Sequence, residues 1–293
     1  MIGNIKAAFK RFLFAFNWMG EEVDNLMDQK LADMSALVGY PDSTPDAAGL
    51  NDYYDALDDS RPSRFFHDWR KALELYARRL VRDQEHLLFL SVKTNVSYFP
   101  AANAIIVPAA GLRPGLFFQD GPASVNYGGL GTVVAREMTK IMDLEAMALD
   151  QPTAVPWNGS DTAKHYASSA RCLLKSQKEA QRLFHAESPS DPVHSEILAD
   201  FVGLLVAYAA FTVLPKEERA VRLHRSPLSS DQTFYAFHCA KLCEMNGNAS
   251  SPSRQAAARL RCVLPLMNSE AFAETFNCPS SSPMNPLKKC SIW

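Results

Sequence analysis

Two segments of the sequence combine an apolar, helix-forming composition with charged side chains at helical spacing. In the first segment Arg136 and Lys140 lie four residues apart, and in the second the corresponding pair is Glu196 and Asp200. Side chains at positions i and i+4 point from the same face of an α-helix. Each segment therefore predicts a helix with one charged face, which either meets solvent or belongs to a site.

The composition is that of a folded globular chain with balanced charge. The 293 residues are 47% hydrophobic, and 30 Lys and Arg against 32 Asp and Glu give a formal net charge of −2. This length suits one large domain or two small ones, and the charge balance argues against a nucleic-acid partner. No apolar run approaches the roughly 18 residues of a transmembrane segment. Lys6, Lys10 and Arg11 interrupt the apolar N-terminal stretch, which favours an amphipathic helix over a signal peptide.

Helical periodicity dominates the rest of the chain. The segment 96–107 predicts a short hairpin closed at 100–103, whereas the Gly- and Pro-rich segment 111–131 and the polar segment 41–62 predict loops. The fold class expected from these patterns is mainly α with a small β element. The predicted helices cover 1–38, as two helices broken near Gly20, and the approximate ranges 63–90, 129–149, 162–185, 195–213, 232–245 and 269–276.

Several short motifs follow one another along the chain. They are Asn95-Val96-Ser97-Tyr98, Ile106-Val107-Pro108-Ala109-Ala110-Gly111, Asn126-Tyr127-Gly128-Gly129-Leu130-Gly131 and the tail Met284-Asn285-Pro286-Leu287-Lys288-Lys289-Cys290-Ser291-Ile292-Trp293. With these motifs, the sequence resembles the neprilysin and endothelin-converting-enzyme family of zinc metallopeptidases over nearly its whole length. The resemblance implies a thermolysin-like (zincin) architecture. It also implies that 1–48 corresponds to the end of the family's lid domain and 49–293 to its catalytic domain.

The active-site motif of that family is altered in this chain. Such peptidases hold zinc with two His at i and i+4 of a helix and a third carboxylate ligand, and the Glu of HExxH activates the zinc-bound water. The resemblance places Arg136 and Lys140 at the two His positions. Glu137 keeps the general-base position, Glu196 the third-ligand position and Asp200 the position that orients a ligand His. One carboxylate does not satisfy zinc, and two cations repel it, so no cofactor is expected.

The altered motif predicts an ion-pair network in place of the metal. The two cationic side chains are expected to pair with the three carboxylates; the alternative is an open site in which all five are solvated. For substrate binding, the resemblance implies Asn95, which would hydrogen-bond an extended peptide backbone. It also implies an Arg, which corresponds to Arg261 or, alternatively, to Arg254 or Arg259.

The cysteines favour an oxidising compartment. The resemblance implies a disulfide between Cys172 and Cys290 and an extracellular or cell-surface location, and three N-glycosylation sequons agree with it. The missing signal peptide and membrane anchor are expected if the chain is a partial sequence, a short splice form or a decayed copy. The pairing of the other cysteines is left open: they are Cys239, Cys243, Cys262 and Cys278.

Together these features predict a peptidase-like domain that has lost zinc binding and proteolysis and retains a peptide or protein ligand. The alternative is a residual metalloendopeptidase with a different metal arrangement, for instance Glu196 with His194 and Asp200. A product without any selected activity is a third alternative. No nucleic-acid partner and no transmembrane segment are expected.

Overall fold

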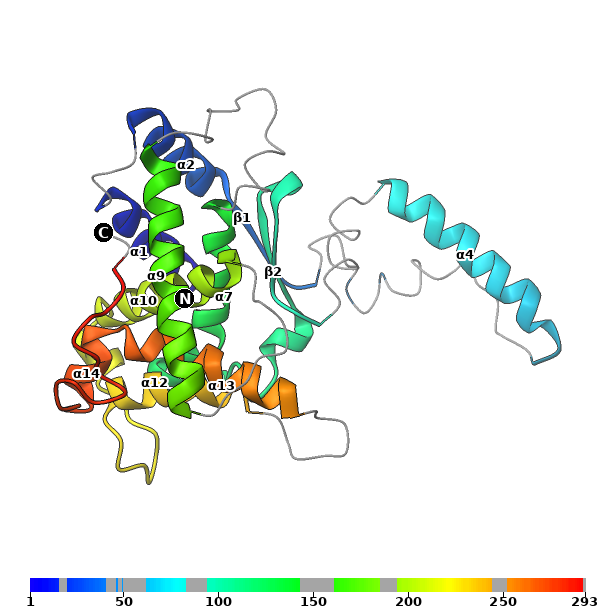
Figure 1. Cartoon of the computed structure of the whole chain (residues 1–293). Coiled ribbons are helices and arrows are strands. Elements are labelled where there is room, and N and C mark those ends of the chain that lie inside the picture. The colour runs from blue at the N-terminus through cyan, green and yellow to red at the C-terminus, as the bar shows by residue number, and fades with distance from the viewer. Residues whose placement is uncertain are drawn as a thin grey trace.

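A computed structural model describes most of the chain. The described residues are 1–15, 20–40, 46, 49, 62–82, 94–142, 161–184, 194–243 and 252–291. They form a helical body with a small sheet at one side, and one helix lies outside that body (Figure 1). The predicted fold class, mainly α with a small β element, is confirmed.

Two buried helices form the centre of the body. They are α7 (Thr132–Thr139) and α10 (His194–Thr212), and they pack against each other along their length. Helix α10 is apolar almost all round and buries Phe201, Val202 and Phe211 completely or nearly so, as expected for a core helix. A Cβ atom on Gly203 would lie 2.7 Å from the backbone nitrogen and Cα of Arg136. The absence of a side chain at Gly203 thus lets the two helices approach closely.

The N-terminal segment covers this core. Helix α1 (Ile2–Phe14) buries Ile5, Phe9 and Leu13, which recur at helical spacing, and it packs on both α10 and α7. Helix α2 (Glu21–Asp33) follows after Gly20. The two predicted helices are confirmed, but the second ends earlier than expected.

A three-stranded sheet lies beside α7 (Figure 1). Strands β2 (Ser97–Phe99) and β3 (Ala104–Pro108) are the predicted antiparallel hairpin, connected by the short helix η2 (Pro100–Ala102). Strand β1 (Ser35–Gly39) pairs in parallel with β3, so the order is β1-β3-β2. The prediction of helix up to residue 38 is therefore wrong. Pairing between Ser35 and Ala104 is a long-range contact, which local periodicity does not reveal.

The segment that leads into α7 is more regular than its Gly and Pro content suggests. It contains η3 (Ala109–Leu112), α6 (Ala123–Asn126) and the π-helical turn η4 (Tyr127–Gly131). The prediction of a loop over 111–131 is wrong for these parts. A Cβ on Gly128 would lie 2.2 Å from the carbonyl oxygen of Phe234, so the glycines here serve helix packing rather than a flexible turn.

Further helices enclose the other side of α10. Helix α9 (Asp161–Phe184) and the short α14 (Glu270–Thr275) lie close to their predicted ranges, and α12 (Ser230–Ala240) is shorter than predicted. Helix α13 (Pro252–Met267), the single turn α11 (Lys216–Arg219) and the 3₁₀ turn η5 (Lys140–Met142), which extends α7, complete this part. The sequence analysis did not predict α13. The predicted loop at 41–62 and the end of the helix predicted for 129–149 lie almost entirely outside the described residues.

Helix α4 (Phe65–Arg82) stands apart from the body, after the short turn η1 (Pro62–Arg64) (Figure 1). It confirms the helix predicted for 63–90, whose last eight residues are not described. The aromatic residues Phe65, Phe66 and Trp69 of this helix are 69%, 69% and 49% exposed. An apolar face of this kind is typical of a surface that contacts another chain or segment.

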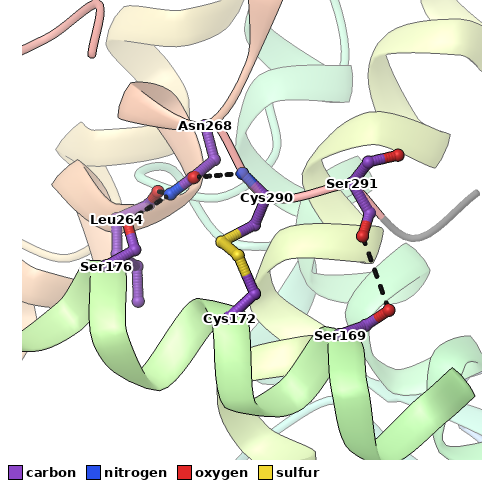
Figure 2. The surroundings of a disulfide bond; sticks show 7 residues. All are labelled: Ser169, Cys172, Ser176, Leu264, Asn268, Cys290 and Ser291. Carbon is purple, nitrogen blue, oxygen red and sulfur yellow. Dashed lines mark hydrogen bonds between the residues drawn. A yellow bond between two sulfur atoms is a disulfide. The ribbon is translucent and has the colours of Figure 1, made fainter. Parts of the chain in front are cut away.

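Two disulfides hold the C-terminal part together. One joins Cys172 of α9 to Cys290 of the tail, the pair that the resemblance implies (Figure 2). Beside it, the side chain of Asn268 accepts a hydrogen bond from the backbone N–H of Cys290 and donates to Ser176 and to the carbonyl of Leu264. The tail is thereby fixed to α9 and α13.

The second disulfide joins Cys239 of α12 to Cys262 of α13. All six cysteines lie in the part of the chain that the structure describes, and there Cys243 and Cys278 form no disulfide. Within the same described ranges, no helix has the length and apolar character that crossing a membrane requires.

Candidate functional site

Helices α7 and α10 bring Arg136 into contact with three carboxylates. Its Nη1 donates to Oε1 of Glu137 at 2.5 Å, and its Nη2 forms an ion pair with Oε2 of Glu196. Its Nε lies 2.6 Å from Oδ1 of Asp200, an ion pair without hydrogen-bond alignment. Because the guanidinium is planar and carries five N–H groups, one side chain can reach acceptors on both helices.

Lys140 lies on the same side of α7 and adds a second positive charge. Its Nζ lies 3.1 Å from Oε2 of Glu137 and 3.6 Å from Oε1 of Glu196. The two cations and three carboxylates that the sequence places on these two helical segments therefore meet in a single network.

Glu137 is the most buried member of this network. Glu137 is 3% exposed. Its Oε2 also accepts a hydrogen bond from the backbone N–H of Tyr98 on β2, at 3.2 Å. Both oxygens of this carboxylate are thus occupied by cations or a backbone donor.

Asp200 connects the network to α13. Nε and Nη2 of Arg261 donate to its two carboxylate oxygens at 2.8 and 3.0 Å. This bidentate hydrogen bonding raises the pKa of Arg261. Of the alternative positions, Arg259 is exposed and donates to the carbonyl of Phe184, and the side chain of Arg254 is not described.

The structure adds Lys241, which the sequence analysis did not single out. Its Nζ donates to Oγ1 of Thr132 and lies 3.2 Å from Nδ1 of His238. The pKa of Lys241 is lowered to about 7, mainly by burial; the charge of Asp200 opposes this shift, and the charges of Arg261 and Arg136 add to it. Burial, with the charge of Lys241, also lowers the pKa of His238 well below its ordinary value. The sequence did contain a signal for this pair: His238 and Lys241 follow the buried Phe234 at helical spacing and therefore lie on the same face.

Two other predicted residues lie at the edge of the site. Asn95 is exposed, directly before β2, and the contact from this segment to the network comes instead from Tyr98. His194 is the first residue of α10, and its side chain is not described.

A cavity of about 210 Å³ lies next to the network. Arg136, Glu196, Asp200 and Arg261 form its polar part, and Gln177 of α9 also lines it. The apolar lining residues come from α10 and α13; they are Ile197, Ala257, Leu260, Leu264 and Pro265.

These donors do not fit a zinc ion. Within the described residues, no group of three His, Cys, Asp or Glu side chains is placed to hold a metal. The carboxylates that come together here are bound by Arg136, Lys140 and Arg261, and a cation already occupies the space between them. A second cation would be repelled.

Comparison with solved structures identifies the fold as that of zinc metalloproteases. The chain aligns over its full length with Mycobacterium tuberculosis zinc metalloprotease Zmp1 in complex with an inhibitor, with a TM-score of 0.73, 21% identity and 46% of that chain covered. It is equally similar to a chain of the Haemonchus galactose-containing glycoprotein complex, with a TM-score of 0.75, 20% identity and 48% of that chain covered. The predicted zincin-type fold is confirmed.

A sequence model of Peptidase family M13 matches residues 95–292, and the chain belongs to this family. It is 28% identical to Neprilysin-2 of Caenorhabditis elegans and 29% identical to Endothelin-converting enzyme 1 of Mus musculus, each over 100% of the chain. The chain spans 42% and 40% of the length of these two relatives. The family resemblance inferred from the sequence is thereby confirmed.

Proposed function

We propose that this chain is a peptidase-like domain of family M13 that has lost zinc binding and proteolysis and binds a peptide or protein. The observation that carries this proposal is the position of Arg136, whose guanidinium pairs with Glu137, Glu196 and Asp200 at once. In an active member, the family motif would place a zinc-binding His at this position. An internal cation thus neutralises the carboxylates in place of the metal.

The state of Glu137 supports the loss of hydrolysis. A general base must be free to accept a proton from a water molecule within hydrogen-bond reach. Here Arg136, Lys140 and the N–H of Tyr98 occupy its two oxygens. Glu137 could act as a general base only after these contacts break.

A retained ligand would be an extended peptide. Strand β2 is at the edge of the sheet, and edge strands bind extended peptides through backbone hydrogen bonds. Asn95 precedes this strand and remains our candidate for a contact to the peptide backbone, together with Arg261. The exposed sequon at Asn95 could instead carry a glycan, which would block that contact.

We further propose that 1–48 belongs to a second domain, the lid of the family, and 49–293 to the peptidase-like domain. The two disulfides favour an extracellular or cell-surface location, because such bonds persist in oxidising compartments. We do not propose a metal site of Glu196, His194 and Asp200, since two arginines already bind Asp200.

Zinc stoichiometry tests this proposal directly. The protein is stripped with a mild chelator, re-exposed to zinc and measured by elemental analysis, together with the double variant R136H/K140H, which restores HExxH. We expect well under one equivalent in the natural protein and a clear gain in the variant, because two His and Glu196 make a three-ligand set. One tightly held equivalent in the natural protein would contradict the proposal, and peptide hydrolysis would then be assayed at once.

A further inference from the structure

The charged side chains around Arg136 do not balance. Among the described residues, this charge cluster contains four basic side chains and three carboxylates. The basic ones are Arg136, Lys140, Lys241 and Arg261, and the acidic ones are Glu137, Glu196 and Asp200. With every group ionised, the cluster is one negative charge short.

Lys241 is the cation that forms no ion pair with a carboxylate among the described residues, although the charge of Asp200 raises its pKa. Among the described residues, the polar atoms near its ammonium group are the hydroxyl of Thr132 and the ring of His238. The Thr132 hydroxyl donates its own hydrogen to the carbonyls of Gly128 and Gly129, so it offers Lys241 only a neutral acceptor. A largely desolvated charge without a counter-ion in direct contact is costly, so a ligand that supplies an additional anion is favoured.

The cavity beside the cluster is where such a ligand can reach the positive charge. Arg136 and Arg261 line it, and both interact electrostatically with Lys241, since their charges lower its pKa. An anion that approaches the two guanidiniums from the cavity would therefore also stabilise the charged form of Lys241. The charged residues that line the cavity balance one another, so the excess positive charge that favours an anionic group there is that of the whole cluster.

The other residues that line the cavity indicate which substituent the bound anion has. Its wall on α13 is aliphatic, with Leu260 and Leu264 5% exposed each, so an apolar substituent is favoured there. The side chain of Gln177 is buried at the same cavity, and its Oε1 has no hydrogen-bond partner among the described residues. An N–H or O–H group on the ligand would satisfy this oxygen.

We propose that this cavity binds a carboxylate that carries an apolar substituent. The carboxylate approaches Arg136 and Arg261 from the cavity side as the fourth anion of the cluster, and the substituent packs against Leu260 and Leu264. The C-terminal residue of a peptide and a free aliphatic or aryl acid share this chemistry. The inference rests on the proposed function, because zinc at this site would require the ion pairs to be broken.

Calorimetric titration with matched acids and amides tests the proposal. The probes are 3-phenylpropionate with 3-phenylpropionamide, and N-acetyl-Ala-Phe with its C-terminal amide. We expect each amide to bind at least about tenfold more weakly than its acid, because hydrogen bonds to a charged partner are the stronger ones. Tighter binding of the acetylated dipeptide than of phenylpropionate would assign the site to peptide C-termini, and the reverse order would assign it to free acids.

Three variants connect any binding to this cavity. Lys241→Met should weaken the binding of the acids by about tenfold and leave the binding of the amides unchanged. Lys10→Met removes an exposed lysine of α1 that pairs with Asp28, and it should change the binding of neither. Ala257→Phe should weaken the binding of both acids and amides, because the phenyl ring fills the cavity. Melting curves confirm that each variant is folded.

The proposal is overturned if the natural protein binds acid and amide equally, or binds neither. It is also overturned if Lys241→Met and Lys10→Met behave alike. Zinc is measured in the same samples: a stoichiometric ion refutes the proposed function, whereas zinc-free protein that does not discriminate acid from amide refutes this inference alone.

Discussion

Arg136 illustrates how one substitution changes the chemistry of a whole site. A guanidinium is permanently charged and holds its N–H donors in a fixed plane, so it can replace a metal ion as the partner of several carboxylates. It contacts Glu137 from its own helix and Glu196 and Asp200 from the neighbouring helix. The carboxylates differ in exposure: the Asp200 side chain is 13% exposed and that of Glu196 is 42% exposed.

This difference leads to a graded prediction for stability. Asp200→Ala should lower the free energy of unfolding by about 1–3 kcal/mol, because it removes one partner of the mostly buried Arg136 and the bidentate partner of the more exposed Arg261. Glu196→Ala should cost at most about 1 kcal/mol, since solvent screens the more exposed pair. Urea denaturation measures both, and Glu270→Ala, which removes an exposed carboxylate paired with Lys289, is the control. Small and equal effects at all three positions would show that the network is solvated.

A second prediction at this scale concerns Lys241 and pH. Because its pKa falls from 10.5 to about 7 on folding, the unfolded chain holds a proton between these values that the folded protein has lost. Below pH 7 both states hold the proton and the cost of burying it is fully present. As the pH rises above 7, the free energy of unfolding should increase, by at most about 1.4 kcal/mol per pH unit.

The measurement compares the free energy of unfolding of the natural protein with that of Lys241→Met at each pH, so that the contributions of other titrating groups cancel. The variant should be the more stable of the two at pH 7, and its advantage should shrink steadily toward pH 9. A stability difference that does not change with pH would mean that Lys241 keeps its ordinary pKa in the folded protein.

At the scale of elements, the contact between α7 and α10 positions the site. The face-to-face approach at Gly203 sets the distance between the helix that carries Arg136 and the helix that carries Asp200. Local sequence predicted both helices and the side chains on their shared faces, because helical periodicity is a short-range property. It failed for β1, whose partner strand lies far along the chain, and for the glycine-rich turns before α7, which depend on close backbone packing.

Gly203→Ala tests this helix contact. The new Cβ would meet the backbone of Arg136, which cannot rotate away, so the helices must separate and stability should fall by about 1–3 kcal/mol. Gly3→Ala is the matched control: within the described residues, nothing lies within 4 Å of its added Cβ, and alanine should stabilise α1 by about 0.5–1 kcal/mol. Thermal unfolding of both variants measures the difference. A neutral Gly203→Ala would mean that the two helices lie farther apart than described.

At the scale of the whole molecule, disulfides and an exposed helix stand out. The Cys172–Cys290 bond joins positions 118 residues apart, and the Cys239–Cys262 bond joins positions 23 apart. Helix α4 exposes aromatic residues outside the body, and the chain spans about two fifths of the length of its relatives. The disulfides stabilise the C-terminal part of the fold, and the exposed aromatic face of α4 is typical of a surface that contacts another chain or segment.

The two disulfides should differ in their contribution to stability. In the chain-entropy description, a longer closed loop restricts the unfolded state more, and these separations predict a difference of about 1.5 kcal/mol. C172S/C290S should therefore destabilise the protein more than C239S/C262S does. Guanidinium denaturation of the two double variants at equal pH checks this order. The opposite order would show that native-state packing, rather than loop closure, decides what each bond contributes.

The sequence by itself determined the family, the long helices and the identity of the side chains at the former metal positions. These follow from ordered motifs and from local periodicity, both of which are written along the chain. Only the tertiary structure decided that Arg136 contacts three carboxylates, that Arg261 is the arginine bound to Asp200, and that Lys241 joins them. The cavity, and the Oε1 of Gln177 that has no hydrogen-bond partner within the described residues, could likewise not be predicted beforehand. The physical reason is that charge balance and enclosed space arise where separate helices meet, so they depend on distances that no single segment encodes.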